Sequence, residues 1–253
     1  MSKKAIILCM SCNQERFINE EHIIRKTWGK DILEGKYDNI ELLFYRGNSD
    51  STYLEKDVLH LTSDDTLTGS YQKTIDCFKW LVENKEFDYI IRTNTSTYIN
   101  VDAIQQFLNF DVDEKQVIGP HLTINGSTKI YIPYLGGHFL IMHKYTVNIL
   151  ITTPYKYKTI GIDDSTIGQV LGLFHKTDYT KHIKEVDSIS DLNKPYLDKL
   201  STAYCVRVKD ESNLENNIVN MIGIHFIYKN IKTKINPPHG FTKIYTLYGQ
   251  IPI

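Results

Sequence analysis

Small polar side chains follow directly on an apolar run between Asp88 and Asn100. Residues 89–91 are a tyrosine and two isoleucines, which is typical of a buried strand, and residues 92–97 then supply a guanidinium, an amide and hydroxyl groups. In open α/β sheets, ligands bind outside the carboxyl ends of the strands. The stretch therefore predicts a ligand site at the end of a strand, with residues 94–96 at its tip.

The pattern along the chain alternates between strand and helix, which predicts an α/β fold with a mixed, mostly parallel sheet flanked by helices. Strands are predicted at 4–10, 40–45, 58–61, 89–93, 117–119, 129–132, 135–142, 203–208 and 222–228. Helices are predicted at 19–33, 70–83, 101–110, 145–151 and 165–173. In the first helix we expect Asn19 to cap the amino end, with Glu20 and Glu21 as first-turn acids.

Length and composition favour one domain over residues 1–253. A chain of this length can bury a full core, and 42% hydrophobic with 23% charged residues is ordinary for a globular protein. The net charge of -1 gives no field that would favour nucleic acid or anionic membranes. Apolar runs such as Ala5–Leu8 are strand-sized, and no signal-peptide pattern precedes them. We therefore expect a soluble, cytoplasmic protein with no membrane span.

Two compositional features carry less information. The four cysteines are too few for a disulfide framework. Cys9 and Cys12 form a C-x-x-C, but no second Cys or His pair answers them, so we expect Cys9 in the first strand and Cys12 in the loop after it, without a redox or metal role. The abundance of Ile, Lys, Asn and Tyr is typical of an AT-rich genome, such as that of a large virus.

Several motifs occur in a fixed order along the chain. They are Ile23–Gly29 (I-I-R-K-T-W-G), Lys73-Thr74 followed by Trp80, residues 94–100 (N-T-S-T-Y-I-N), Tyr134–Gly137 (Y-L-G-G), Ile162–Gly168 (I-D-D-S-T-I-G) and Gly223–Phe226 (G-I-H-F). This series resembles the Fringe, β-1,3-galactosyltransferase and β-1,3-N-acetylglucosaminyltransferase family of GT-A-type glycosyltransferases. The resemblance covers about residues 6 to 226.

The resemblance implies an inverting glycosyltransferase. Such an enzyme moves a hexose or N-acetylhexosamine from a UDP-sugar donor to an acceptor, here a glycan or a glycosylated protein. It implies a nucleotide-binding part at about 1–110 and an acceptor-side part at about 111–253. By position in the motifs, the residues expected at the nucleotide-sugar site are Arg25, Lys73, Arg92, Asn94, Thr95, Ser96, Gly136, Gly137, Asp163 and His225.

The same resemblance makes Asp164 the general base that takes the proton from the acceptor hydroxyl as it attacks the anomeric carbon. An aspartate before Ser165 would also favour a helix start whatever its chemistry. Both interpretations hold together if Asp163 caps the helix and Asp164 faces the sugar.

The metal is the point at which this chain departs from the family. The family holds a divalent ion, usually manganese, with three aspartates and a late histidine, because hard cations prefer carboxylate oxygens. Here the aspartate positions are the neutral Asn94, Thr95 and Ser96. We therefore expect no required metal, with Arg92, Lys73 or His225 neutralising the diphosphate. A manganese site through His225 stays open.

Other interpretations stay open beside this one. The missing carboxylates also fit a catalytically inactive scaffold that binds a nucleotide or a glycan. Arg25 could lie on a solvated helix face, and Trp28 is expected in the core. The two glycines at 136 and 137 most simply permit a close backbone approach, and His225, between apolar neighbours, could be a core residue.

Overall fold

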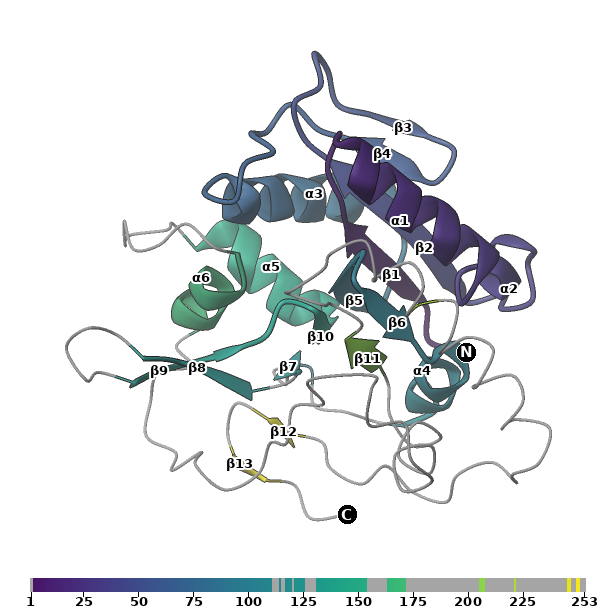
Figure 1. Ribbon diagram of the computed structural model, residues 1–253. Coiled ribbons are helices and arrows are strands. Elements are labelled where there is room, and N and C mark those ends of the chain that lie inside the picture. The colour runs from purple at the N-terminus through teal and green to yellow at the C-terminus, as the bar shows by residue number, and fades with distance from the viewer. Residues whose placement is uncertain are drawn as a thin grey trace.

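Seven strands form one mixed sheet in the order β3-β4-β2-β1-β5-β10-β7 (Figure 1). In chain order they are β1 (Ala5–Met10), β2 (Ile40–Arg46), β3 (Tyr53–Glu55), β4 (Val58–His60), β5 (Tyr89–Asn94), β7 (Val117–Ile118) and β10 (Phe139–His143). The four strands β4, β2, β1 and β5 run parallel, whereas β3 and β10 are antiparallel to their neighbours. The predicted α/β class with a mixed, mostly parallel sheet is confirmed.

This computed structural model describes residues 2–110, 114, 117–119, 121–125, 131–153, 163–171, 205–207, 221, 245–246 and 249–250. Three short two-stranded sheets accompany the main one. They pair β6 (Thr97–Ile99) with β11 (Cys205–Arg207), β8 (His121–Asn125) with β9 (Tyr131–Leu135), and β12 (Tyr245–Thr246) with β13 (Gly249–Gln250).

Helices cover both faces of the main sheet, and each face has its own core. One core contains side chains from α1 (Glu15–Lys26), α2 (Lys30–Leu33) and α4 (Val101–Phe107). The other contains side chains from α3 (Ser70–Asn84), α5 (Lys144–Thr152) and α6 (Asp163–Val170), and Figure 1 shows these three helices grouped together. Strand β1 serves both cores because alternate side chains point to opposite faces: Ile7 and Cys9 join the first, Ile6 and Leu8 the second.

The first helix begins earlier than the sequence predicts. It starts at Glu15 with Gln14 as its capping residue, so Glu20 and Glu21 are interior residues and not first-turn acids. Both are buried, at 3% and 0% exposure. Buried carboxylates of this kind are tolerated because arginine and hydroxyl partners reach them. Arg16 and Arg25 lie four residues away on the same helix, whereas Arg46 and Thr95 come from other parts of the chain. Trp28 is in the core, as expected.

Two predicted elements differ in their bounds at the candidate site. The strand predicted at 135–142 is interrupted: β9 ends at Leu135, a turn contains Gly136 and Gly137, and β10 begins at Phe139. The helix predicted to start at Ser165 begins at Asp163. Both aspartates are therefore first-turn residues, and Asp163 is not the residue before the helix. The strand predicted at 222–228 lies outside the described residues. Five of the described strands were not predicted, namely β3, β6, β8, β12 and β13.

Candidate active site

The candidate site lies at the carboxyl edge of the parallel strands. Strands β1 and β5 end side by side, with Met10 paired to Asn94. Strand β10 starts beside the end of β5, with Phe139 paired to Thr93. The turn between β9 and β10 therefore lies at the same edge as the polar cluster after β5, which is where an open α/β sheet binds ligands.

A buried ion pair joins β5 to α6. A guanidinium Nη2 atom of Arg92 donates to Oδ2 of Asp163, and the two residues are 1% and 3% exposed. Burial acts to lower the pKa of Arg92, but Asp163, Tyr45 and Asp164 together outweigh burial, so the pKa is raised. Burial also raises the pKa of the Asp163 carboxyl, and the charge of Arg92 acts in the opposite direction. The structure thus places Arg92 inside the protein, at the base of the site.

Asp164 lies beside this pair and, unlike it, is only half-buried. Its Oδ2 accepts the backbone N–H of Gly137 at 3.0 Å, and its Oδ1 accepts the backbone N–H of Ser165 at 2.7 Å. Each carboxylate oxygen has a second lone pair. Asp164 is therefore oriented by two donors and retains acceptor capacity for a hydroxyl group.

Gly137 has no room for a side chain. A Cβ atom there would lie 2.5 Å from Nη1 of Arg92 and 3.0 Å from Cβ of Asp164. The close backbone approach expected of the glycine pair is present at this position, and its neighbours are the arginine and the aspartate of the same site.

The amino end of α3 holds the first turn of α6 from the other side. The backbone N–H of Asp163 donates to Oγ of Ser70 at 3.2 Å. Oγ1 of Thr74 lies 3.5 Å from Oδ2 of Asp163 and 2.9 Å from the phenol oxygen of Tyr45. Asp163 is thus held by β5 and α3 together, which fixes where the next residue, Asp164, points.

Lys73 is at the same edge but is also bonded to a carboxylate. Its Nζ atom donates to the backbone oxygen of Ser11 at 2.8 Å and to Oδ1 of Asp65. Asp65 in turn accepts the backbone N–H of Asn13 at 3.1 Å. Lys73 is 3% exposed, so in this structure its charge is largely neutralised within the protein.

Asn94, the last residue of β5, and the two neutral residues that follow it, Thr95 and Ser96, do not all point to one place. Oδ1 of Asn94 accepts the hydroxyl groups of Ser96 and Thr97, each at 2.9 Å, and so closes the turn from β5 to β6. Thr95 points elsewhere and donates its hydroxyl to the buried Glu20 of α1. The donor set at this turn is neutral and already engaged, which does not fit a hard divalent ion. Among the described residues, no group of three His, Cys, Asp or Glu side chains is placed to bind a metal.

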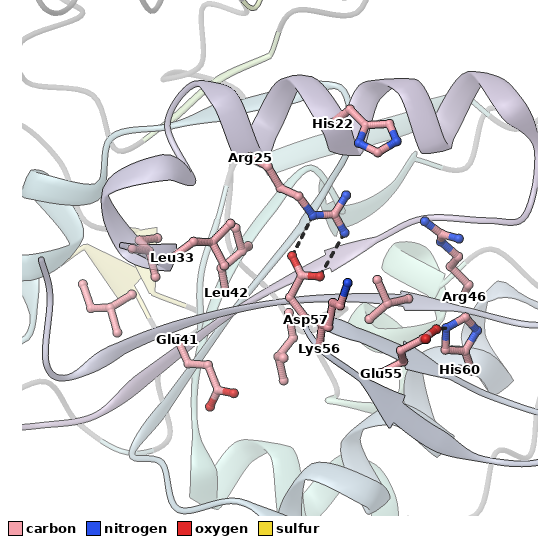
Figure 2. Close-up of a pocket in the computed structure, with 14 residues that line it drawn as sticks. His22, Arg25, Leu33, Glu41, Leu42, Arg46, Glu55, Lys56, Asp57 and His60 are labelled. Atoms are coloured by element: carbon pink, nitrogen blue, oxygen red, sulfur yellow. Dashed lines mark hydrogen bonds and ion pairs between the residues drawn. The ribbon is translucent and has the colours of Figure 1, made fainter. Parts of the chain in front are cut away.

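Arg25 is not near Asp164. Its guanidinium forms two hydrogen bonds with the Asp57 carboxylate, at 2.7 and 3.1 Å, and stacks over the ring of Phe44 at 4.4 Å. It lines a cavity of about 840 Å³ between α1, α2, β2 and the β3–β4 hairpin. Figure 2 shows the Arg25–Asp57 pair crossing this cavity. On its face of α1, Arg25 therefore forms a salt bridge with Asp57.

The structure thus separates the predicted site residues into groups. Arg92, Gly137, Asp163 and Asp164 come together, and Lys73 joins the same edge with Gly136 in the adjoining turn. Asn94 and Ser96 close the β5–β6 turn, and Thr95 and Arg25 contact other parts of the protein. His225 lies outside the described residues.

The sequence did not predict Asp65, Ser70, Thr74 or Tyr45 as site residues. Thr74 had two usable signals: it belongs to the Lys73-Thr74 motif, and with Ser70 it forms a pair of polar residues four apart on a helix whose neighbours Ile75 and Phe78 are apolar. Asp65 and Tyr45 had none, since neither spacing nor residue type marks the partner of a distant side chain.

The protein is thus an α/β protein that has a half-buried carboxylate at the carboxyl edge of its sheet. No family model and no curated protein sequence matches the chain. Two solved structures of the glycosyltransferase GlyE from Streptococcus pneumoniae TIGR4 are distantly similar. The apo form has 10% identity and a TM-score of 0.40 over 94% of this chain, and the other has 10% identity and a TM-score of 0.39 over 95%. This chain spans 65% and 66% of those two chains.

The sequence was also expected to contain no membrane span. Within the described part of the chain, no helix is both long enough and apolar enough to cross a bilayer.

Proposed function

We propose that the protein is an inverting glycosyltransferase of the GT-A type that moves a hexose or N-acetylhexosamine from a UDP-sugar to a glycan or glycosylated protein. Asp164 is the general base in this proposal. Its carboxylate takes the proton of the acceptor hydroxyl as that oxygen bonds to the anomeric carbon, and the bond from the anomeric carbon to the diphosphate breaks on the opposite side, releasing UDP.

One observation carries the proposal: the adjacent aspartates at the start of α6 differ in access. Asp163 is buried against Arg92, whereas Asp164 is half-buried and oriented by the N–H groups of Gly137 and Ser165. A general base must be held within hydrogen-bond reach of the proton it removes, with acceptor capacity left. The two backbone donors orient Asp164 and leave it acceptor capacity, and it lies at the edge where ligands of this fold class bind.

The developing charge of the leaving diphosphate needs a positive partner. We assign this part to Lys73, because an ammonium group has three donors and its contacts with Ser11 and Asp65 use two of them. His225 is the second candidate, on its place in the family resemblance alone. In this proposal the transfer needs no metal, because Asn94, Thr95 and Ser96 supply no carboxylate.

The alternative is a non-catalytic scaffold that binds a nucleotide or a glycan. It is favoured by the pairing of cations at the same edge, since Lys73 and Arg92 are each bonded to a carboxylate. A site whose positive charges are neutralised internally is poor at stabilising a leaving diphosphate.

The test compares wild type, Asp164→Asn and a control, Asp50→Asn, which changes an exposed aspartate in a loop. Release of UDP is measured with UDP-galactose, UDP-glucose and UDP-N-acetylglucosamine against a panel of mono- and disaccharide acceptors, and UDP binding by calorimetry. We expect turnover to fall about a hundredfold or more in Asp164→Asn, with UDP affinity unchanged and with Asp50→Asn equal to wild type.

Three other outcomes decide against parts of the proposal. Near-normal turnover in Asp164→Asn would remove Asp164 as the base. UDP binding without turnover in wild type would favour the scaffold. No UDP binding at all would overturn both the transferase and a nucleotide-binding scaffold.

A further inference from the structure

We propose that Arg92 and Asp163 form a positioning device for Asp164. In this view Arg92 is not a ligand of the diphosphate. Its buried bond to Asp163 fixes the first turn of α6 against β5 and so holds Asp164 at the N–H of Gly137. The proposal rests on the proposed function for the reaction that is served, but the positioning itself can be measured without turnover.

Burial makes the ion pair an obligatory link. With Arg92 at 1% and Asp163 at 3% exposure, removal of either partner leaves an uncompensated charge inside the protein, which is strongly destabilising to the local structure. Arg92 also contacts Sδ of Met10 on β1 at 3.3 Å. The guanidinium therefore ties α6 to the two central strands of the sheet.

The geometry leaves Asp164 little freedom once Asp163 is fixed. Ser70 accepts the Asp163 N–H at 3.2 Å, so the start of α6 is held from α3 as well as from β5. The Gly137 N–H reaches Oδ2 of Asp164 at 3.0 Å, and Nη1 of Arg92 occupies the space directly beside Gly137. Arg92 thus contacts both the turn that orients Asp164 and the residue that precedes it.

The experiment uses the full chain labelled with ¹⁵N and follows the amide resonance of Gly137, whose proton lies in the bond to Asp164. The variants are Asp163→Asn, the conservative Arg92→Lys, and Ser70→Ala, which weakens the same anchor without a buried charge. The matched control is Glu21→Gln, because Glu21 is also a buried carboxylate bonded to an arginine, Arg46, but it lies on α1.

We expect the Gly137 amide proton to move upfield in Asp163→Asn and less so in Ser70→Ala, as the bond to Asp164 lengthens. The Gly137 amide proton resonance stays at the wild-type position in Arg92→Lys and Glu21→Gln. With a UDP-sugar, kcat in Asp163→Asn falls about tenfold to a hundredfold, the scale of a misplaced catalytic group, while the KM of the donor stays within about twofold, as uniform donor binding is untouched.

Failure of this inference differs from failure of the proposed function. An unchanged Gly137 amide in both Asp163→Asn and Ser70→Ala, or a shift of the same size in Glu21→Gln, would overturn the positioning role even if wild type transfers sugar. A donor KM raised at least tenfold in Arg92→Lys would return Arg92 to the diphosphate. Wild type without turnover, but with the expected amide shifts, would support the positioning and reject the transferase.

Discussion

Asp163 and Asp164 are neighbours in the chain with opposite surroundings. The first is buried against a guanidinium and held from two sides, and the second is half-buried and held by two backbone N–H groups. A carboxylate that is fully enclosed and paired cannot reach an acceptor hydroxyl, whereas one with a free lone pair at the surface can. This difference in burial supports the proposed roles of Asp163 as an anchor and Asp164 as the general base.

Gly137 gives the prediction that belongs to this cluster. In Gly137→Ala the new methyl group meets Nη1 of Arg92 and Cβ of Asp164. Arg92 cannot move aside because Asp163 holds it, so we expect a loss of about 1–3 kcal/mol in the free energy of unfolding, typical of overpacking. UDP release should fall at least tenfold, because Asp164 loses its position.

The control for this variant is Gly35→Ala. Gly35 has a φ of 76°, and an added methyl group there would meet nothing within 4 Å, so its cost is conformational, about 1–2 kcal/mol. Urea unfolding and UDP release of both variants should show similar destabilisation but a loss of turnover only in Gly137→Ala. Equal turnover in the two variants would mean that the close contacts of Gly137 do not position Asp164.

The connection from β5 to β6 supplies the side chains that a metal ion would meet at this strand end. Asn94 closes the turn by accepting two hydroxyl groups, and Thr95 faces α1, where Glu20 accepts its hydroxyl. The side chains are thus used to hold the turn, and they offer an ion no charge. A strand end that could carry three carboxylates is here stabilised by hydrogen bonds of three uncharged side chains.

We predict that the affinity for UDP, measured by calorimetry, changes less than tenfold, about 1.4 kcal/mol, when EDTA replaces manganese. The double variant Asn94→Asp with Ser96→Asp should gain manganese dependence, because it restores two carboxylates at the turn. The variant Asn84→Asp, which adds a carboxylate at the exposed end of α3, should not.

A larger loss of affinity on chelation in wild type would reveal a metal site that the described residues do not form. Absence of manganese dependence in the double variant would instead question the alignment of residues 94–96 with the aspartates of the family.

At the scale of the molecule, the described residues form two hydrophobic cores, one on each face of the main sheet, and their burial stabilises the fold. Cys9 belongs to the core under α1 and Cys77 to the core under α3. Burial raises the pKa of both thiols well above the ordinary value, and it raises the pKa of Cys205 to about 12. The folded protein therefore keeps these thiols protonated at a pH where the unfolded chain would lose the protons.

The sign of the pH dependence follows from this difference. Above about pH 8.5, the ordinary pKa of a cysteine, the unfolded chain binds fewer protons than the folded protein, so the free energy of unfolding falls as pH rises. The stability is fully present below that pH and is lost progressively toward the raised pKa values. We expect a fall of at most about 1.4 kcal/mol per pH unit for each buried thiol.

The measurement is urea unfolding in reducing buffer at pH 7.0 and 9.5, for wild type and Cys77→Ala. The variant is less stable at both values, because it creates a cavity, but its stability should fall less between them. Parallel losses in the two proteins would show that the Cys77 thiol does not contribute to the pH dependence.

The features of this protein that depend on local patterns could be predicted from its sequence. The alternation of apolar strands with helices of period 3.6 identified the α/β class, because that periodicity is written into neighbouring residues. The polar run after an apolar stretch located the cluster after β5, and the family resemblance located the acid pair at the start of α6. Bounds were less exact. Glu20 and Glu21 resembled first-turn acids because their burial depends on Thr95 and Arg46, which are distant in the sequence.

The pairing of charged groups could not be predicted from the sequence and was seen first in the tertiary structure. Arg92 and Asp163 are 71 residues apart, and Lys73 is bonded to Asp65 although other carboxylates in the sequence had an equal claim. Such pairs are set by strand order and register and by the placing of helix ends over the sheet, none of which has a local signal. The physical reason is that periodicity records which face of an element is buried, whereas the partner of a buried charge depends on what the rest of the chain brings to that face.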